Sequence, residues 1–285
     1  MRIMMFSFFL LIIADYASPH ELGEGPVPDP LPPVGPRVYP CFQFPNGCLP
    51  VIDGDLSDWE IVGSEYVQDT YMLVEYNWHL GRRYNPHDCD VRIRTGYNLS
   101  TNRIYVAVEY YDDFHNFDRT TTSDDPGLDD IFELVVDADN SGQDFIFNPD
   151  RSHLRSTHAQ NYHIYFHGRD STHVWVWGDQ HWLGEMPYSK FASRYDGAHR
   201  SAGVSTLEFW VTPFNYADPA GPEYSAVAHL AEGDTLGLGY AILDWDADEG
   251  HGAKFWALAD TVLIYRNADF LPDFVLAPLK KDMGK

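Results

Sequence analysis

The chain has 285 residues, of which 44 % are hydrophobic and 15 % aromatic, so it can bury the core of one large domain or two small ones. Its 43 acidic and 19 basic residues give a net charge of −24. A protein of this charge repels phosphates, which argues against nucleic acid as a partner. The same charge is compatible with divalent cations and with uncharged or cationic ligands.

The N-terminal sequence "MRIMMFSFFLLII" places one positive charge before an apolar run. A run of about ten apolar residues is too short to cross a bilayer and is typical of a secretion signal. We expect residues 1–17 to be a signal peptide and the protein to be secreted or periplasmic. The sequence has no second long apolar segment, so we expect no membrane span in the mature chain.

A proline-rich segment, residues 18–40, follows the signal and contains "GPVPDPLPPVGPRVYP". Proline at this density favours an extended spacer over a helix. We therefore expect one folded domain over residues 41–278 and a frayed tail over residues 279–285. Cys41 and Cys48 flank a turn-like loop, and both a disulfide between them and unpaired thiols remain open.

Short segments rich in β-branched and aromatic residues recur through the domain, and glycine, proline, aspartate and asparagine separate them. The segments are residues 91–97, 103–111, 131–137, 161–168, 173–178, 205–212 and 235–245. A turn at residues 99–102 predicts that the first two form a hairpin. Because no long apolar period of 3.6 residues occurs, we predict an all-β fold, an antiparallel, jelly-roll-like β-sandwich. Its long loops should gather at the sandwich ends and carry the binding site.

Several segments, in the same order, resemble the family-nine carbohydrate-binding modules and their relatives in the DOMON-like superfamily. The opening "VIDGDLSDWE" is similar to the family's first turn, and "DDIFELVVDADN" is similar to its acidic strand at Asp130, Glu133 and Asp137. "GDTLGLGYAILDWD" resembles a later strand, and "AKFWALADTVLI" resembles the closing strand. The resemblance covers residues 51–265. It implies a β-sandwich that binds sugars, commonly with structural calcium.

The chain departs from the family at the sugar clamp, where some members hold a glycan end between two tryptophans. "PGL" at residues 126–128 and "DEGHG" at residues 248–252 stand at the two clamp positions, so neither tryptophan is present. The resemblance still marks Trp245, at a tryptophan-bearing strand end. It also places Gln160 and Tyr162 at polar ligand contacts, and His163 where some members carry arginine.

Aromatic residues between 173 and 188 are further candidates for ligand binding. Trp175 and Trp177 share one face of a predicted strand, where they either pack in the core or form a stacking platform. Trp182 lies among polar residues and is expected to be exposed. Flat aromatic rings stack on the apolar face of a sugar while polar groups bond its hydroxyls. The predicted ligand-binding residues are Trp245, Trp182, Trp177, Gln160, Tyr162 and His163.

The sequence "DADNSGQD" predicts a calcium site after the acidic strand. Asp137, Asp139 and Ser141 alternate before a glycine, as in the first half of an EF-hand loop. Asp144 is expected to add a carboxylate, although Asn148 stands where an EF-hand has its last glutamate. The alternative is an acidic turn that caps its own backbone.

The sequence favours a secreted, non-catalytic domain that binds a saccharide and assists polysaccharide breakdown. No P-loop or dinucleotide-binding loop followed by a helix occurs, so no nucleotide cofactor is expected. Besides a surface structural module that binds no small ligand, two alternatives with a defined chemistry remain open. One is a haem-binding electron-transfer domain, suggested by the 13 histidines, although no CxxCH motif occurs. The other is a glycan-active hydrolase, because 43 acidic residues always contain some plausible pair.

Overall fold

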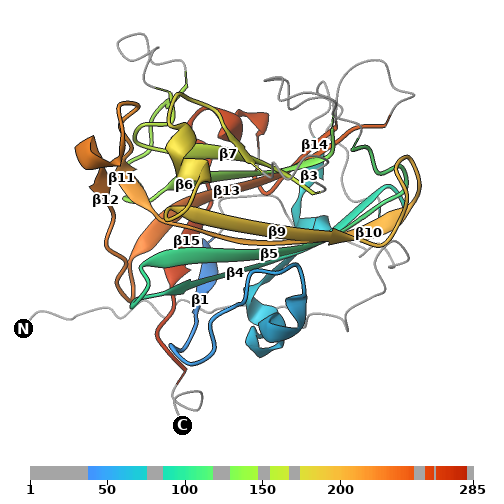
Figure 1. Ribbon diagram of the computed structural model, residues 1–285, viewed down its shortest axis with the longest axis horizontal. Coiled ribbons are helices and arrows are strands. Elements are labelled where there is room, and N and C mark those ends of the chain that lie inside the picture. Colours follow the sequence, from blue (N-terminus) through green and yellow to red (C-terminus); the bar gives the residue numbers. More distant parts are fainter. Residues whose placement is uncertain are drawn as a thin grey trace, which may run out of the picture.

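The computed structural model describes residues 38–75, 86–117, 129–146, 155–166, 174–246, 254–259 and 261–280. The predicted signal peptide, most of the proline-rich segment and both clamp positions lie outside the described residues. The described part is built from β-strands and short 3-10 helices (Figure 1). The predicted all-β sandwich is therefore confirmed.

One layer of the sandwich, sheet A, has the strand order β8-β7-β6-β13-β15, and all neighbours in this run are antiparallel. The short strand β14 pairs with β13, and β3 pairs with β14. The strands are β3 (Val74–Glu75), β6 (Ile131–Asp137), β7 (Gln160–Tyr165), β8 (Val174–Val176), β13 (Thr235–Asp244), β14 (Lys254–Ala257) and β15 (Asp273–Leu276).

The facing layer, sheet B, has the order β4-β5-β10-β9, again antiparallel, and β2 pairs with β4. The predicted hairpin at residues 99–102 joins β4 to β5, with Asn98 opposite Arg103. The strands are β2 (Val67–Asp69), β4 (Cys89–Asn98), β5 (Arg103–Asp112), β9 (Ser189–Tyr195) and β10 (Gly203–Val211).

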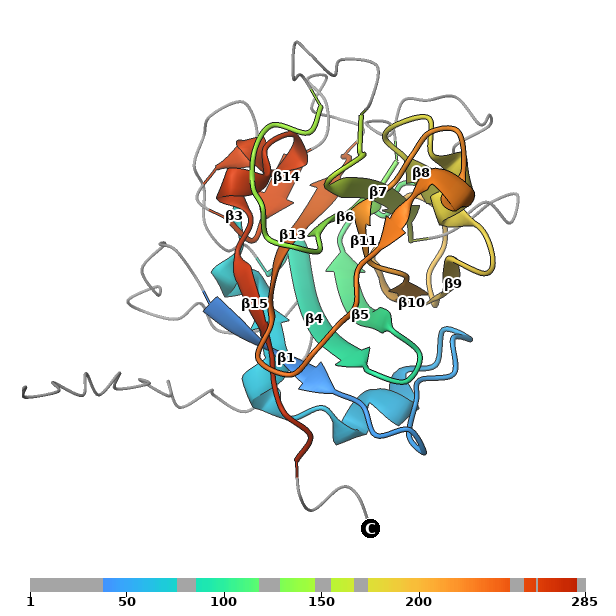
Figure 2. The same ribbon diagram turned by 90° about the vertical axis from the view of Figure 1, so that its left-hand side faces the viewer.

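Strand β1 (Val38–Gln43) connects the two sheets and is the exception to the antiparallel prediction. Its first part pairs in parallel with β15, and its last residues pair in parallel with β4 (Figure 2). The folded part therefore includes Val38–Pro40, which the proline-rich pattern assigned to the spacer.

The remaining described elements are a small sheet and seven 3-10 helices. They are β11 (Phe214–Tyr216), β12 (Ala226–Val227), η1 (Leu56–Ile61), η2 (Ser64–Tyr66), η3 (Thr70–Met72), η6 (His181–Gly184), η7 (Pro222–Tyr224), η8 (Val262–Tyr265) and η9 (Ala268–Phe270). The predicted closing strand is wrong in its second half: β14 ends at Ala257, and η8 follows in place of more strand. The strand that closes sheet A is β15.

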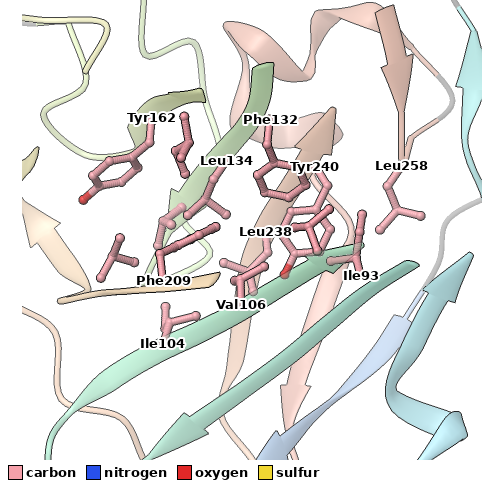
Figure 3. Packing of buried hydrophobic residues seen from close by; sticks show 14 of the residues in the cluster. Ile93, Ile104, Val106, Phe132, Leu134, Tyr162, Phe209, Leu238, Tyr240 and Leu258 are labelled. Atoms are coloured by element: carbon pink, nitrogen blue, oxygen red, sulfur yellow. The ribbon is translucent and has the colours of Figure 1, made fainter. Parts of the chain in front are cut away.

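The main core lies between the two sheets and is filled by alternate residues of the facing strands (Figure 3). Ile93, Val106 and Phe209 come from sheet B, and Phe132 and Leu238 come from sheet A; each is fully buried. Burial of one such side chain contributes about 1.5–3 kcal/mol, so this interface supplies most of the driving force for folding.

Short segments cover both outer faces of the sandwich. The segment that contains η1 packs Trp59 against the outer face of sheet B, where Trp59 Nε1 donates to Oε2 of Glu208 at 2.9 Å. Trp59 is fully buried. The segment of η8 and η9 packs Ile264 and Leu271 against the outer face of sheet A.

Two other sequence expectations can be compared with the described residues. Cys41, Cys48 and Cys89 are all free, so the open alternative of a Cys41–Cys48 disulfide is not the one that the structure adopts. In the described part of the chain, no helix has the length and hydropathy required to span a bilayer.

Candidate functional site

A row of side chains on the outer face of sheet A forms the main candidate site. Glu133 of β6 lies opposite His163 of β7, and His163 lies opposite Trp175 of β8. Alternate residues of a strand point to opposite faces, and Leu134 and Ile164 are in the core between the sheets. The row Glu133–His163–Trp175 therefore faces outward.

Stacked rings continue this row, and we call the four rings of His163, Trp175, Trp177 and Tyr265 the aromatic face. The ring centroids of His163 and Trp175 lie 4.8 Å apart at an interplanar angle of 26°. Trp175 and Trp177 are 6.4 Å apart, and Trp177 and Tyr265 are 5.7 Å apart, at 14°. His163 is buried, whereas the other three rings are half-buried. The guanidinium carbon of Arg155 lies 5.9 Å from the Trp177 ring.

A layer of buried polar groups lies beneath these rings. Asn161 donates from Nδ2 to Oε1 of Glu133 at 2.6 Å and to the carbonyl of Tyr265 at 3.1 Å. Nε2 of His163 is 3.8 Å from the same Glu133 oxygen. Two buried atoms, Oδ1 of Asn161 and Nδ1 of His163, have no hydrogen-bond partner. The layer fixes the rings and retains unused hydrogen-bonding capacity.

Burial sets the charge of this polar layer. Burial raises the pKa of Glu133 to about 7, although the hydrogen bond from Asn161 opposes the shift. Burial also lowers the pKa of His163 to about 3, so this ring is neutral under physiological conditions.

The predicted ligand residues on β7 lie on both faces of the strand. His163 and Trp177 belong to the aromatic face, as described above. Tyr162 is 1 % exposed and packs in the core between the sheets, and Gln160 is fully buried with Nε2 bonded to the carbonyl of Thr157. Neither side chain can contact a ligand on the aromatic face, because the strand alternation turns both inward.

The other two predicted tryptophans lie away from the aromatic face. Trp182 of η6 is half-buried, packs edge-on against Tyr188 and Phe214, and donates from Nε1 to the carbonyl of Asp218 at 3.1 Å. These contacts hold the surrounding loop, so Trp182 is not the exposed ring that the sequence predicted. Trp245 follows β13 and is half-buried; its backbone N–H donates to Oδ1 of Asp130.

The acidic and aromatic loops that were expected at one sandwich end are divided between the two ends. The end of β8, which leads into the aromatic loop, lies beside the start of β7 and so at the same end as the loop after Asp137. The register places Gly237 opposite Asp137 and Leu243 opposite Ile131. Because β6 and β13 are antiparallel, the loop after Asp137 lies at one end of this pair and Trp245 lies beyond the other.

The predicted calcium loop is held by its own hydrogen bonds. Oδ2 of Asp137 accepts from the N–H of Gly142 at 2.8 Å, and Oδ1 of Asp144 accepts from the N–H of Ile146. The second oxygen of Asp144 is 3.7 Å from Arg266. Asp139 and Ser141 are exposed, and Oδ1 of Asp137 is buried without a partner. This arrangement resembles the acidic turn of the alternative interpretation. The carboxylates of Asp137, Asp139 and Asp144 are not among the groups of the described residues whose ligand atoms lie within 4.8 Å of one another.

A second group of carboxylates lies at the opposite end of sheet A, and we call it the acidic end cluster. Its members fall into three overlapping groups of three residues. Within each group, one carboxylate oxygen or imidazole nitrogen of every residue lies within 4.8 Å of the others. Burial and the neighbouring carboxylate of Asp112 raise the pKa values of Asp130 and Asp244. The cluster comprises Asp88, Asp112, Asp113, His115, Asp130, Asp244 and Asp246.

The fold is shared with known sugar-binding structures. A carbohydrate-binding module family 9 from Caldicellulosiruptor kristjanssonii in complex with cellotriose superimposes with a TM-score of 0.53, at 13 % identity, over 87 % of this chain and 96 % of that one. The module in complex with glucose gives 0.52, at 14 % identity, over 87 % and 100 %. The chain has a family 9-like fold. No family model and no curated protein matches its sequence.

Proposed function

We propose that the chain is a non-catalytic carbohydrate-binding domain whose ligand site is the aromatic face. The observation that carries the proposal is the set of half-buried rings of Trp175, Trp177 and Tyr265 on the outer face of sheet A. Aromatic rings exposed side by side on a rigid sheet offer a flat apolar surface to a pyranose. The shared fold supports the proposal, because two structures with this fold are described as a carbohydrate-binding module in complex with cellotriose and with glucose.

The polar layer supplies the directional part of recognition. A sugar hydroxyl that reaches beneath the rings would meet Oδ1 of Asn161 and Nδ1 of His163, the two buried atoms without partners. Buried polar atoms without partners are costly, so a ligand that bonds them gains affinity. Because both clamp tryptophans are absent, the sugar stacks on one side only, along the row of rings.

Calcium and export belong to the same proposal. The family resemblance implies calcium, and of the predicted ligands the buried, partnerless Oδ1 of Asp137 suits a cation best. Asp144 would have to leave Arg266 and Ile146 to join it. The proposal also keeps the signal peptide and a secreted or periplasmic location, where polysaccharides are found.

A glycan array with the purified chain, run with and without EDTA, tests the proposal. We expect binding to at least one neutral oligosaccharide by the wild-type chain. The Trp175→Ala and Trp177→Ala variants should lose that binding, whereas Tyr224→Ala, which removes a ring that is 64 % exposed elsewhere, should retain it. Binding that disappears in Trp245→Ala but persists in both aromatic-face variants would place the site at the other end of the sheet. Loss with EDTA would support the calcium prediction.

A further inference from the structure

Six of the seven residues of the acidic end cluster form two groups of three, here called its halves, that differ in how their charge is compensated. In one half, Lys254 provides the cation. Its Nζ lies 2.7 Å from Oδ1 of Asp88, 2.5 Å from Oδ2 of Asp246 and 3.7 Å from Oδ2 of Asp244. A lysine ammonium in this position occupies the place that a metal ion would take, so this half requires no ion.

The other half consists of Asp112, His115 and Asp130, which are fully buried or nearly so. Nδ1 of His115 lies 3.2 Å from Oδ2 of Asp130 and 3.5 Å from Oδ2 of Asp112. No ion pair links Asp112 or Asp130 to a lysine or arginine within the described ranges. Two buried carboxylates therefore face one imidazole.

The contacts within this half are incomplete. Nδ1 of His115 and Oδ2 of Asp112 are buried and make no hydrogen bond, because neither carboxylate oxygen is aligned with the ring nitrogen. Asp130 accepts backbone hydrogen bonds, at Oδ2 from Asn116 and at Oδ1 from Trp245, but neither oxygen bonds to the imidazole. A buried imidazole nitrogen and a buried carboxylate oxygen without partners, beside a second carboxylate, form an arrangement that suits a metal ion. This observation is independent of the acidic character of the cluster.

The histidine ring is also held as a metal ligand usually is. Nε2 of His115 is 3.1 Å from Oγ of the buried Ser205, and the ring stacks on Tyr195 at a centroid distance of 4.5 Å. When Nε2–H donates to the serine, Nδ1 carries a lone pair and lies within 3.5 Å of an oxygen of each carboxylate. A hydrogen bond at the far nitrogen that fixes the tautomer in this way is the usual support of a metal-bound histidine.

We propose that Asp112, His115 and Asp130 form a site for a divalent transition-metal ion, with Zn²⁺ the best match. Two ligand atoms bound at about 2.0–2.1 Å to a tetrahedral ion lie about 3.3 Å apart. The separations of 3.2 and 3.5 Å between Nδ1 of His115 and the two carboxylate oxygens bracket this value. One nitrogen and two carboxylate oxygens suit zinc, whereas calcium requires six to eight oxygens. Water completes the fourth position. The ion neutralises the carboxylates and joins the end of β5 to the start of β6.

Metal analysis of the full chain tests this proposal. After dialysis against metal-free buffer, we expect about one Zn²⁺ per chain to be retained, in keeping with the tight binding of zinc at sites built from several protein ligands. Asp112→Asn and His115→Gln should weaken Zn²⁺ binding at least about tenfold, and Ser205→Ala by about tenfold. Glu223→Gln, at an exposed acid outside the cluster, should leave it unchanged.

A second measurement keeps the proposal falsifiable if the buried variants do not fold. Co²⁺ added to the metal-free wild-type chain should give the visible absorption of a four-coordinate nitrogen–oxygen site, and one equivalent of Zn²⁺ should abolish it. A folded chain that takes up no Zn²⁺ and shows no Co²⁺ band would overturn the proposal. Stabilisation by Ca²⁺ without Zn²⁺ binding would also overturn it, because the imidazole would then not be a ligand.

Discussion

Asn161 donates a 2.6 Å hydrogen bond from Nδ2 to Oε1 of Glu133, and this bond links β7 to β6 under the aromatic face. The same glutamate is buried, and its one ion-pair contact within the described residues is Nε2 of His163 at 3.8 Å. A carboxylate in such a place is costly to ionise. The burial of Glu133 beside Asn161 therefore affects stability as well as binding.

Glu133 should make the domain less stable as the pH rises. Its pKa is raised from the ordinary 4.5 to about 7, so the folded state binds more protons than the unfolded state between these values. Stability is full below 4.5 and falls as the pH rises to about 7, by about 3 kcal/mol for this group. Glu133→Gln keeps the shape of the side chain without the charge. The difference in unfolding free energy between the wild type and this variant, measured with denaturant, should change by this amount between pH 4.5 and pH 7. A constant difference at all pH values would contradict the argument.

Glu208 should be a major determinant of stability on the opposite face. Its two carboxylate oxygens accept from the N–H groups of Asp53 and Gly54 and from Nε1 of Trp59. Glu208→Ala leaves these donors without partners and should lower the free energy of unfolding by about 3 kcal/mol. Glu223→Ala, at an exposed position, is the control and should change it by less than about 0.5 kcal/mol. Equal effects in thermal or urea unfolding would rule out this role for Glu208.

Gly96 of β4 is required by close packing. A Cβ atom built at this position would lie 2.3 Å from the ring of Phe44 and 2.9 Å from the carbonyl of Phe42. Gly96→Ala must displace both and should cost about 1–3 kcal/mol. Gly47→Ala is the matched control, because no atom lies within 4 Å of its added Cβ. Calorimetry of the two variants should therefore show a lower Tm for Gly96→Ala alone.

The strands could be predicted where apolar and β-branched residues dominate both faces. Strands β4, β5, β6 and β13 match their predicted segments to within two residues at each end. Strand β9 was missed because "SKFASRY" is polar at an edge position, where one side faces no neighbour. Strand β1 was missed because Pro40 lies inside it.

The site was harder to predict, because the sequence of β7 does not show which of its residues point to the core and which point to the outer face. "QNYHIY" carries polar and aromatic residues on both faces, so Tyr162 and His163 look equally suitable as ligand contacts. The acidic end cluster was missed for another reason. Asp112, Asp130 and Asp244 are far apart in sequence. The register of β6 with β13 places Asp130 near Asp244, and Asp112 comes from the end of β5 in the facing sheet. An aspartate at the end of each predicted strand was the available signal.

Titration calorimetry with the saccharide that the array identifies tests the central claim most directly. The wild-type chain should bind it, Trp175→Ala should bind at least about tenfold more weakly, a loss of about 1.4 kcal/mol, and Tyr224→Ala should bind as the wild type does. Equal affinity of Trp175→Ala and the wild type, or a wild-type chain that binds no saccharide on the array, would contradict a sugar site on the aromatic face.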